Sequence, residues 1–160
     1  GAKAAVLCKR LSLRGLFATP CADVTSATSG ADIVVTTTPA TSPLLHAAQS
    51  GQHITAMGSD AEHKNEIKPG LLKLAYYVAD RLSQTRILGE LDHAIAAGIV
   101  SGEQDFPELG QIIAGTSPGR ADREAITIAD LTGTGIQDTA IASLAVSRAR
   151  AAGTGQSFTV

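Results

Sequence analysis

A carboxylate and an ammonium group lie four residues apart in the polar segment GSDAEHKNEI, residues 58–67. Gly58 opens this segment directly after an apolar run and permits a sharp turn there. If the segment is helical, Asp60 and Lys64 share one face, where they can hold a donor in place and tune the pKa of a proton-transferring group. The alternative is structural: Asp60 is only a helix N-cap, and the remaining residues form a solvated face.

The same segment also contains residues of the types that bind metals, namely Asp60, Glu62, His63 and Glu66. Their spacing fits no strong metal-ligand pattern. We therefore predict no metal site in this chain.

A second candidate is the turn containing Gly133 and Gly135, between an expected strand at residues 125–129 and an expected helix at residues 137–152. This is the context in which glycine-rich turns bind dinucleotide phosphates. In the dinucleotide-binding pattern G-x-G-x-x-G, Asp138 stands here in place of the third glycine. Its carboxylate would repel a pyrophosphate at the helix N-terminus. A tight turn that places Asp138 favourably in the first helical turn is one alternative. We favour a further interpretation, in which the two glycines let the backbone approach a ligand closely at the carboxyl end of a strand.

The elements that position these residues are short apolar runs alternating with helical segments. We expect strands at residues 16–22, 32–37, 53–57, 76–80 and 125–129, and helices at residues 2–12, 43–49, 69–75, 82–97, 107–114 and 137–152. This alternation favours βαβ units, hence an α/β fold with a parallel sheet. Because α/β sheets bind ligands beyond the carboxyl ends of their strands, we expect Asp60 to lie over the ligand crevice.

Composition narrows the class of protein. The 160 residues suffice for one domain and carry a net charge of -2, which makes nucleic acid an unlikely partner. No apolar run reaches the roughly 18 residues that a membrane span needs. Cys8 and Cys21 lack metal-ligand spacing, and we interpret them as free buried thiols in a reducing cytoplasm.

Five segments resemble, in the same order and spacing, the ornithine cyclodeaminase/mu-crystallin family. They are ADIVVTTTPATSPLL, AMGSDAEHKNEI, DRLSQTRILGELDHAIAAG, ELGQIIAGTSPGR and ITIADLTGTGIQDTAIASLAVSRA. The sequences of MGSDAEHKNEI and DRLSQTRILGEL are most similar to those of the family's ectoine-utilisation branch. The resemblance covers the C-terminal half of such proteins, whose phosphate-binding turn lies upstream of any segment found here. It therefore implies a fragment, or a chain completed by a partner.

The resemblance also implies an architecture. The sheet is expected to be an incomplete, Rossmann-like, doubly wound parallel sheet. Residues 1–136 are then the C-terminal part of an NAD(P)-binding domain. Residues 137–160 are a helix and tail that return to the substrate and dimerisation domain.

An activity follows from the same resemblance: an NAD- or NADP-dependent enzyme that oxidises a small amino acid to an imine, which cyclises with loss of ammonia. An amino-acid dehydrogenase or imine reductase of the family is one alternative. A non-catalytic protein that binds NADPH and a small ligand is another. The expected partners are a small amino-acid substrate and a second copy of the chain, in the cytoplasm.

Site residues are carried over by their positions in these motifs. Asp60 corresponds to the catalytic carboxylate that handles protons on the substrate nitrogen, and Lys64 to a lysine near the nicotinamide carboxamide. The remaining cofactor-binding residues implied are Thr37, Pro39, Gly58, Thr132 and Gly133. The last two, together with Asp130, correspond to the family's Asp-Ser-x-Gly element beside the nicotinamide. Leu131 stands where the family has a serine, so a side-chain hydrogen bond of the family is missing there.

Overall fold

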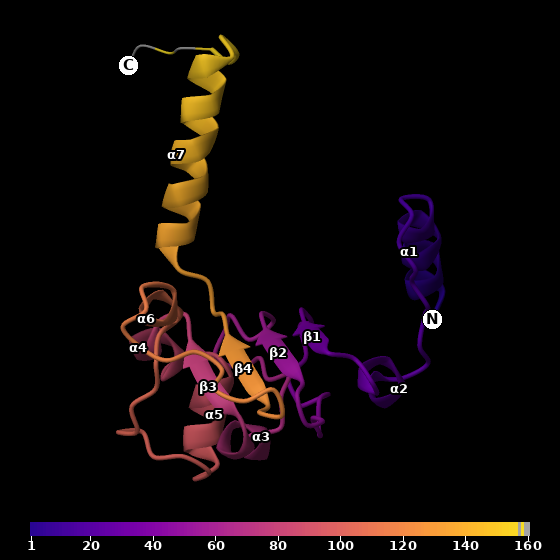
Figure 1. Ribbon diagram of the computed structural model, residues 1–160, viewed down its shortest axis with the longest axis vertical. Coiled ribbons are helices and arrows are strands. Elements are labelled where there is room, and N and C mark those ends of the chain that lie inside the picture. Colours follow the sequence, from indigo (N-terminus) through magenta and orange to yellow (C-terminus); the bar gives the residue numbers. More distant parts are fainter. Residues whose placement is uncertain (157, 159–160) are drawn as a thin grey trace.

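The computed structural model describes residues 1–156 and 158, and its centre is a four-stranded parallel sheet (Figure 1). The strands are β1 (Ile33–Thr36), β2 (His53–Ala56), β3 (Tyr76–Ala79) and β4 (Thr127–Asp130). They lie in the order β1-β2-β4-β3, and every neighbouring pair is parallel. The expected α/β fold with a parallel sheet is therefore confirmed.

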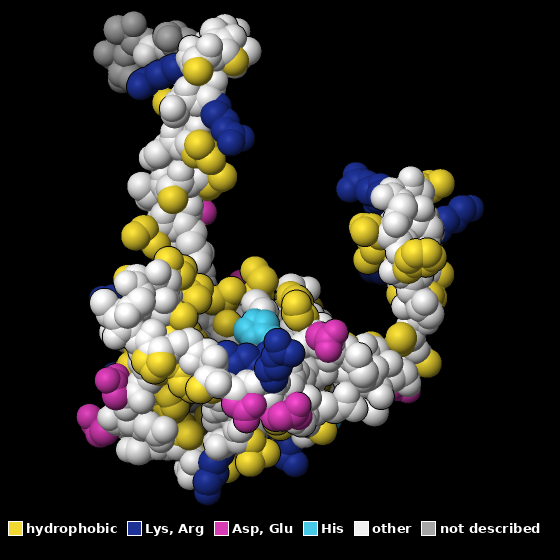
Figure 2. Space-filling model, in the orientation of Figure 1, with side chains coloured by type: hydrophobic (Ala, Val, Ile, Leu, Met, Phe, Trp, Pro, Cys, Tyr) yellow, Lys and Arg dark blue, Asp and Glu magenta, His cyan; other side chains and the backbone are white. Residues whose placement is uncertain are grey.

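Seven helices are found among the described residues. They are α1 (Ala2–Ser12), α2 (Val24–Thr28), α3 (Gly70–Leu74), α4 (Leu82–Thr85), α5 (Glu90–Ala96), α6 (Leu109–Ile113) and α7 (Gly135–Ala151). The two long helices, α1 and α7, project away from the sheet and contain no buried residue (Figure 1). Apolar side chains are visible along both (Figure 2). None of the described helices combines the length and apolar character needed to span a membrane.

The core lies against one face of the sheet. Alternate strand residues, among them Ile54, Tyr77 and Ile128, are almost completely buried. They pack in one cluster with apolar residues of the following helices, such as Leu71 of α3 and Leu91 of α5. Among the described residues, leucine, β-branched residues and alanine build most of this core, with Tyr77 as its one buried aromatic residue.

The opposite face of the sheet is more open. Ile33 and Val35 of the edge strand β1 point to this face, and 65% and 55% of their surfaces are exposed. Leu109 and Ile112 of α6 border a depression of about 220 Å³ beside Val78. The sheet is thus covered unevenly: α3 and α5 pack on the core side, whereas α6 lies beside the open face.

The predicted helix at residues 43–49 is wrong. Leu45 instead forms a parallel bridge with Ile67 and is 1% exposed. The backbone amides of Leu44 and Leu45 both donate to the Glu66 carbonyl at 2.9 Å, and Lys68 N donates to the Leu45 carbonyl at 2.9 Å. Hydrogen bonds to a distant segment replace those of a helix, so local propensity was overridden.

The predicted continuous helix at residues 82–97 is interrupted. Helix α4 ends at Thr85, and α5 begins only at Glu90. Gly89 between them has φ +98°, and a Cβ there would lie 2.8 Å from Thr132 Cγ2 and 3.0 Å from Asp130 Oδ2. The chain bends here so that its backbone can approach the end of β4, which only glycine permits.

The predicted strand at residues 16–22 is also wrong, since none of these residues pairs with another strand. Phe17 is fully exposed and Leu16 is 55% exposed, so no packing surface holds the segment extended. Cys8 and Cys21 are free, as expected, but half-buried rather than buried. The remaining predicted strands and helices are found with boundaries shifted by a few residues.

Candidate active site

The residues predicted to form a site gather at the carboxyl edge of the sheet. The parallel register brings Thr36, Ala56, Ala79 and Asp130, the last residues of the four strands, side by side. The predicted site residues directly follow three of these strands: Thr37 and Pro39 after β1, Gly58, Asp60 and Lys64 after β2, and Thr132 and Gly133 after β4. This is the edge at which open α/β sheets bind ligands.

Asp60 and Lys64 form an ion pair on the loop after β2. Lys64 Nζ lies 2.5 Å from Asp60 Oδ1, and the two side chains are 24% and 54% exposed. The segment between them is a turn, closed by a 2.9 Å bond from Lys64 N to the Ala61 carbonyl. No helix begins at Asp60, so it is not an N-cap. The hydrogen bond from Lys64 lowers the pKa of Asp60, which keeps this accessible carboxylate anionic.

A buried carboxylate, Glu66, joins the loop after β1 to the loop after β2. Glu66 is completely buried. Its Oε1 accepts a hydrogen bond from Thr38 N at 2.5 Å, and its Oε2 accepts one from Gly58 N at 2.9 Å. The turn holding Thr37 and Pro39 is thereby fixed to the start of the loop that carries Asp60.

A second buried carboxylate, Glu90, is held by that same loop. It accepts hydrogen bonds from Ser59 Oγ, from Asn65 Nδ2 at 2.7 Å, and from the backbone amides of Glu66 at 2.9 Å and Ile67 at 3.0 Å. Burial raises the pKa of Glu90, while the hydrogen bonds from Ser59, Glu66 and Ile67 act in the opposite direction.

A third carboxylate, Asp130, ends β4 beneath the other two. Its Oδ2 accepts hydrogen bonds from Tyr77 Oη at 2.7 Å, Glu90 N at 2.9 Å and Leu91 N at 3.2 Å. Its Oδ1 is buried without a partner among the described residues. Burial is the main cause that raises the pKa of Asp130 to about 7, and burial also raises the pKa of Tyr77. Asp130 thus anchors the start of α5 to the end of the sheet.

The turn after β4 is held by the half-buried Asp80 at the end of β3. Asp80 accepts hydrogen bonds from Thr132 Oγ1 at 3.1 Å and from Gly133 N at 3.0 Å. Gln84 Nε2 donates to the Gly133 carbonyl at 2.7 Å. Beside this turn lies an open depression of about 510 Å³, whose lining includes Asp80, Gln84 and Thr134.

The free polar groups at this edge determine which part of a dinucleotide it can hold. Thr36 Oγ1 is buried at the end of β1 without a partner among the described residues, and it could bond a polar ligand group next to the Asp60 loop. The amides of Thr38, Gly58 and Gly133 all donate to carboxylates. Those amides are therefore not available for a pyrophosphate.

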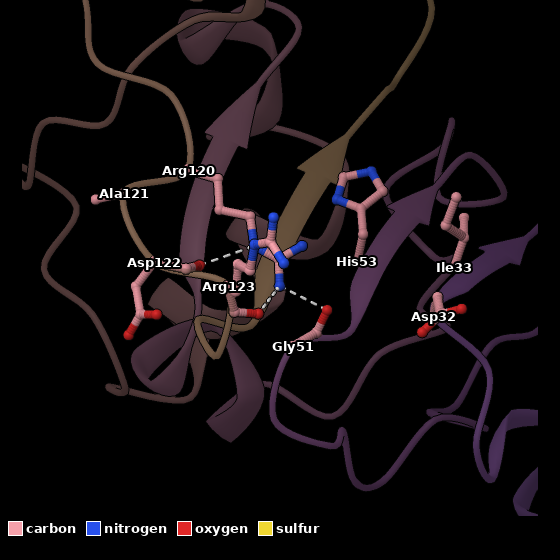
Figure 3. Close-up of a pocket in the computed structure, with 8 residues that line it drawn as sticks. All are labelled: Asp32, Ile33, Gly51, His53, Arg120, Ala121, Asp122 and Arg123. Atoms are coloured by element: carbon pink, nitrogen blue, oxygen red, sulfur yellow. Dashed lines mark hydrogen bonds between the residues drawn. The ribbon is translucent and has the colours of Figure 1, made fainter.

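A second concavity, of about 500 Å³, lies at the opposite end of the sheet, near the amino ends of β1 and β2 (Figure 3). Its most prominent side chain, Arg120, is engaged with backbone. Arg120 Nη2 donates to the carbonyls of Gly51 at 2.6 Å, Arg123 at 2.5 Å and Ala125 at 2.8 Å, and its Nε donates to Asp122 at 2.9 Å. Through these hydrogen bonds to backbone carbonyls, Arg120 holds the loop before β4 in place.

The described residues contain no group of three His, Cys, Asp or Glu side chains close enough to hold a metal ion. His63, Glu62 and Asp60 are exposed, whereas Glu66 is buried and bonded to two backbone amides. The four residues that sequence spacing had grouped as a conceivable cluster are thus in different surroundings.

The fold is an open parallel α/β sheet, the class of protein that binds ligands beyond the carboxyl ends of its strands. The sequence profile of the ornithine cyclodeaminase/mu-crystallin family matches residues 2–153. The chain therefore belongs to this family, as the motifs suggested.

Three curated relatives illustrate the similarity. The chain is 64% identical to a provisionally named dehydrogenase of Rhizobium meliloti, over 85% of its length and 42% of the relative. It is 56% identical to an uncharacterized cyclodeaminase of Sinorhizobium fredii, over 98% of this chain and 48% of the relative. It is 42% identical to the iminosuccinate reductase of Paracoccus denitrificans, over 79% of this chain and 39% of the relative. The chain thus spans less than half the length of these relatives.

A solved structure supports the fold and the cofactor class. An archaeal alanine dehydrogenase dimer with bound NAD superposes with a TM-score of 0.90 at 34% identity, over 98% of this chain and 49% of that one. NAD or NADP was the cofactor expected from the sequence, and NAD is the cofactor of this neighbour.

Sequence reasoning missed the buried carboxylates Glu66 and Glu90 as organisers of the site; Asp130 had been singled out only through the family resemblance. Glu66 and Glu90 look like ordinary surface acids, because each lies in a polar or helical stretch where charged residues are usually solvated. The one signal available was the motif resemblance, since both residues fall inside matched segments. Their pairing with backbone amides depends on contacts between residues 8 to 28 positions apart in the sequence.

Proposed function

We propose that this chain carries the catalytic carboxylate of an NAD(P)-dependent enzyme that acts on a small amino acid in the manner of an ornithine cyclodeaminase. The observation that carries the proposal is the Asp60–Lys64 pair, joined at 2.5 Å, with Asp60 54% exposed at the ligand-binding edge of the sheet. A carboxylate so placed can reach a bound molecule. Lys64 keeps it anionic and ready to accept a proton.

The reaction needs a base and then an acid at one nitrogen. Bound NAD(P) supplies the hydride acceptor for the α-carbon and later the hydride donor to the cyclic imine. Asp60 accepts the proton that the α-amino nitrogen loses when the C=N bond forms. After the side-chain amine attacks the imine carbon, one proton of that amine passes to the α-nitrogen and Asp60 returns the proton it accepted. The α-nitrogen then leaves as ammonia, and the ring nitrogen keeps one proton in the cyclic iminium that accepts the hydride. The loop anchored by Glu66 holds Asp60 in register with the turn after β1.

A second candidate is an amino-acid dehydrogenase or imine reductase, which carries out one hydride transfer without cyclisation. The similarity to an iminosuccinate reductase favours this candidate. The two reactions differ in their use of the cofactor. A cyclodeaminase releases ammonia without net reduction of NAD(P), whereas a dehydrogenase forms one reduced cofactor for each ammonia released.

The wider context is proposed on the same basis. We infer that residues 137–160 belong to a second domain that contributes to substrate binding and dimerisation, supported by the absence of buried residues in α7. Ser157, Thr159 and Val160 of that range lie outside the described residues. A homodimer in the cytoplasm is the expected assembly, and use of a diamino acid connected with ectoine utilisation is the expected role.

The test uses the intact protein with ornithine, diaminobutyrate or alanine and a limiting amount of NAD or NADP. Asp60→Asn should abolish turnover, because the amide cannot accept the proton, while NADH still binds in a fluorescence titration. Glu62→Gln, which removes an exposed carboxylate two residues away, is the matched control. Turnover by Asp60→Asn at the wild-type rate would exclude the catalytic role of Asp60. NADH binding without turnover of any substrate would favour a binding protein.

A further inference from the structure

The buried carboxylate Glu90 holds four donors that all come from one loop. Ser59 Oγ and the Glu66 amide donate to its Oε1, and Asn65 Nδ2 and the Ile67 amide donate to its Oε2. These donors lie on both sides of Asp60 and Lys64 in the chain. Glu90 is completely buried, so it cannot touch a substrate.

From this arrangement we propose that Glu90 is a positioning residue, which holds the loop from Ser59 to Ile67 so that Asp60 and Lys64 face the ligand. The proposal deepens the proposed function and rests on the assignment of Asp60 as the catalytic carboxylate. Glu90 acts through the loop and takes no part in the chemistry.

Burial of a carboxylate is unfavourable unless hydrogen bonds replace its hydration. The loop supplies that replacement, so a shift of the loop away from Glu90 would leave the carboxylate buried and unpaired. Glu90 is itself fixed, because its backbone amide and that of Leu91 donate to Asp130 at 2.9 and 3.2 Å. The chain of contacts runs from the end of β4 through α5 to the Asp60 loop, and each connection is a hydrogen bond to a buried carboxylate.

Glutamine cannot take the place of Glu90, although it has the same shape. Each carboxylate oxygen accepts from a backbone amide, Oε1 from Glu66 and Oε2 from Ile67. Whichever way the Gln amide is turned, its NH2 group faces one of these N–H groups, and that hydrogen bond is lost. Glu90→Gln is therefore a nearly isosteric change that breaks one of the two backbone hydrogen bonds between the loop and residue 90.

The experiment measures the intact protein and its Glu90→Gln and Ser59→Ala variants. Ser59→Ala removes a single donor to Glu90 and is the milder change if Glu90→Gln folds poorly. Asp92→Asn is the matched control, since Asp92 lies in the same first turn of α5 and is partly exposed. Active sites are counted by NADH titration, so that kcat is expressed for each folded, cofactor-binding site.

We expect Glu90→Gln to lower kcat per site by about 10- to 100-fold, because small misplacements of a catalytic group have effects of this size. The Kd for NADH should stay within about threefold of wild type, since Glu90 touches no bound molecule. In hydrogen exchange, the amides of Glu66 and Ile67 should lose protection in Glu90→Gln but not in Asp92→Asn.

A wild-type kcat per site in Glu90→Gln, with Asp60→Asn inactive, would overturn the positioning role and leave the proposed function intact. The role is also overturned if the Glu66 and Ile67 amides keep their protection in Glu90→Gln and Ser59→Ala. If Asp60→Asn is fully active, the proposed function fails, whatever Glu90→Gln does.

Discussion

The Glu66 carboxylate occupies the space that a Cβ atom would need at Gly58. It also accepts a 2.9 Å hydrogen bond from the Gly58 amide. These two residues are eight positions apart in sequence and close the loop that carries Asp60 and Lys64. The absence of a side chain at position 58 is therefore a packing requirement of the site.

Replacing Gly58 by alanine should displace the Glu66 carboxylate from its hydrogen bonds with Gly58 N and Thr38 N. We expect a loss of about 2–4 kcal/mol in the free energy of unfolding, from steric overlap and broken hydrogen bonds to a charged group. Urea unfolding followed by circular dichroism measures it. Gly110→Ala is the control, because a Cβ at Gly110 meets nothing within 4 Å and alanine suits a helix. Equal stability of the two variants would contradict the packing requirement.

Replacing Lys64 by alanine should raise the pKa of Asp60, because the Lys64 hydrogen bond is the largest cause of its lowering. We expect kcat/KM to fall on the order of tenfold or more, through weaker cofactor or transition-state binding. Steady-state kinetics measures the fall, with Lys68→Ala as the control for loss of a nearby exposed lysine. Wild-type kinetics in Lys64→Ala would remove Lys64 from the site.

Asp130 should make stability depend on pH. Its pKa is raised from 3.8 to about 7 in the folded state, so its contribution to stability is fully present below about pH 4 and is lost as pH rises to about 7. The loss has a slope on the order of 1.4 kcal/mol for each pH unit in that window. Tyr77 of β3 and Glu90 of α5 face the same carboxyl group and influence its titration.

Asp130→Asn isolates this contribution. The Asn carbonyl can still accept the bonds from Tyr77, Glu90 and Leu91, while no charge is buried. Relative to Asp130→Asn, the wild-type protein should become progressively less stable between pH 4 and pH 7, with no further change above pH 8. Urea titrations at several pH values measure the difference in unfolding free energy. A difference that does not vary with pH would show that Asp130 remains ionised throughout.

Arg120→Lys should affect stability without affecting the site. The ammonium group of lysine cannot span the carbonyls of Gly51, Arg123 and Ala125, and we expect a loss of about 1–2 kcal/mol. Arg123→Lys is the control, because Arg123 receives a bond only at its carbonyl. Because Arg120 lies near the amino ends of the strands (Figure 3), kcat per folded site should not change. A fall in kcat with stability unchanged would mean that this concavity has a functional role.

Much of the sheet could be predicted from local pattern. The runs DIVVTT and HITAM are short, apolar and β-branched, and such segments form buried parallel strands in most surroundings. The segment at residues 43–49 has a helical composition, yet it lies extended because Leu45 pairs with Ile67. The interruption at Gly89 likewise depends on Asp130, which is far away in sequence. Both errors arose where tertiary contacts outweighed local propensity.

The sequence by itself determined the family, the parallel α/β fold and the position of Asp60, Lys64 and the Gly133 turn at strand ends. Because all strands of a parallel sheet run in the same direction, those ends lie along one edge. Only the tertiary structure decided what holds them there. Glu66, Glu90 and Asp130 became buried hydrogen-bond acceptors because separate segments direct their amides at them, and a carboxylate is stable inside a protein only when such donors surround it.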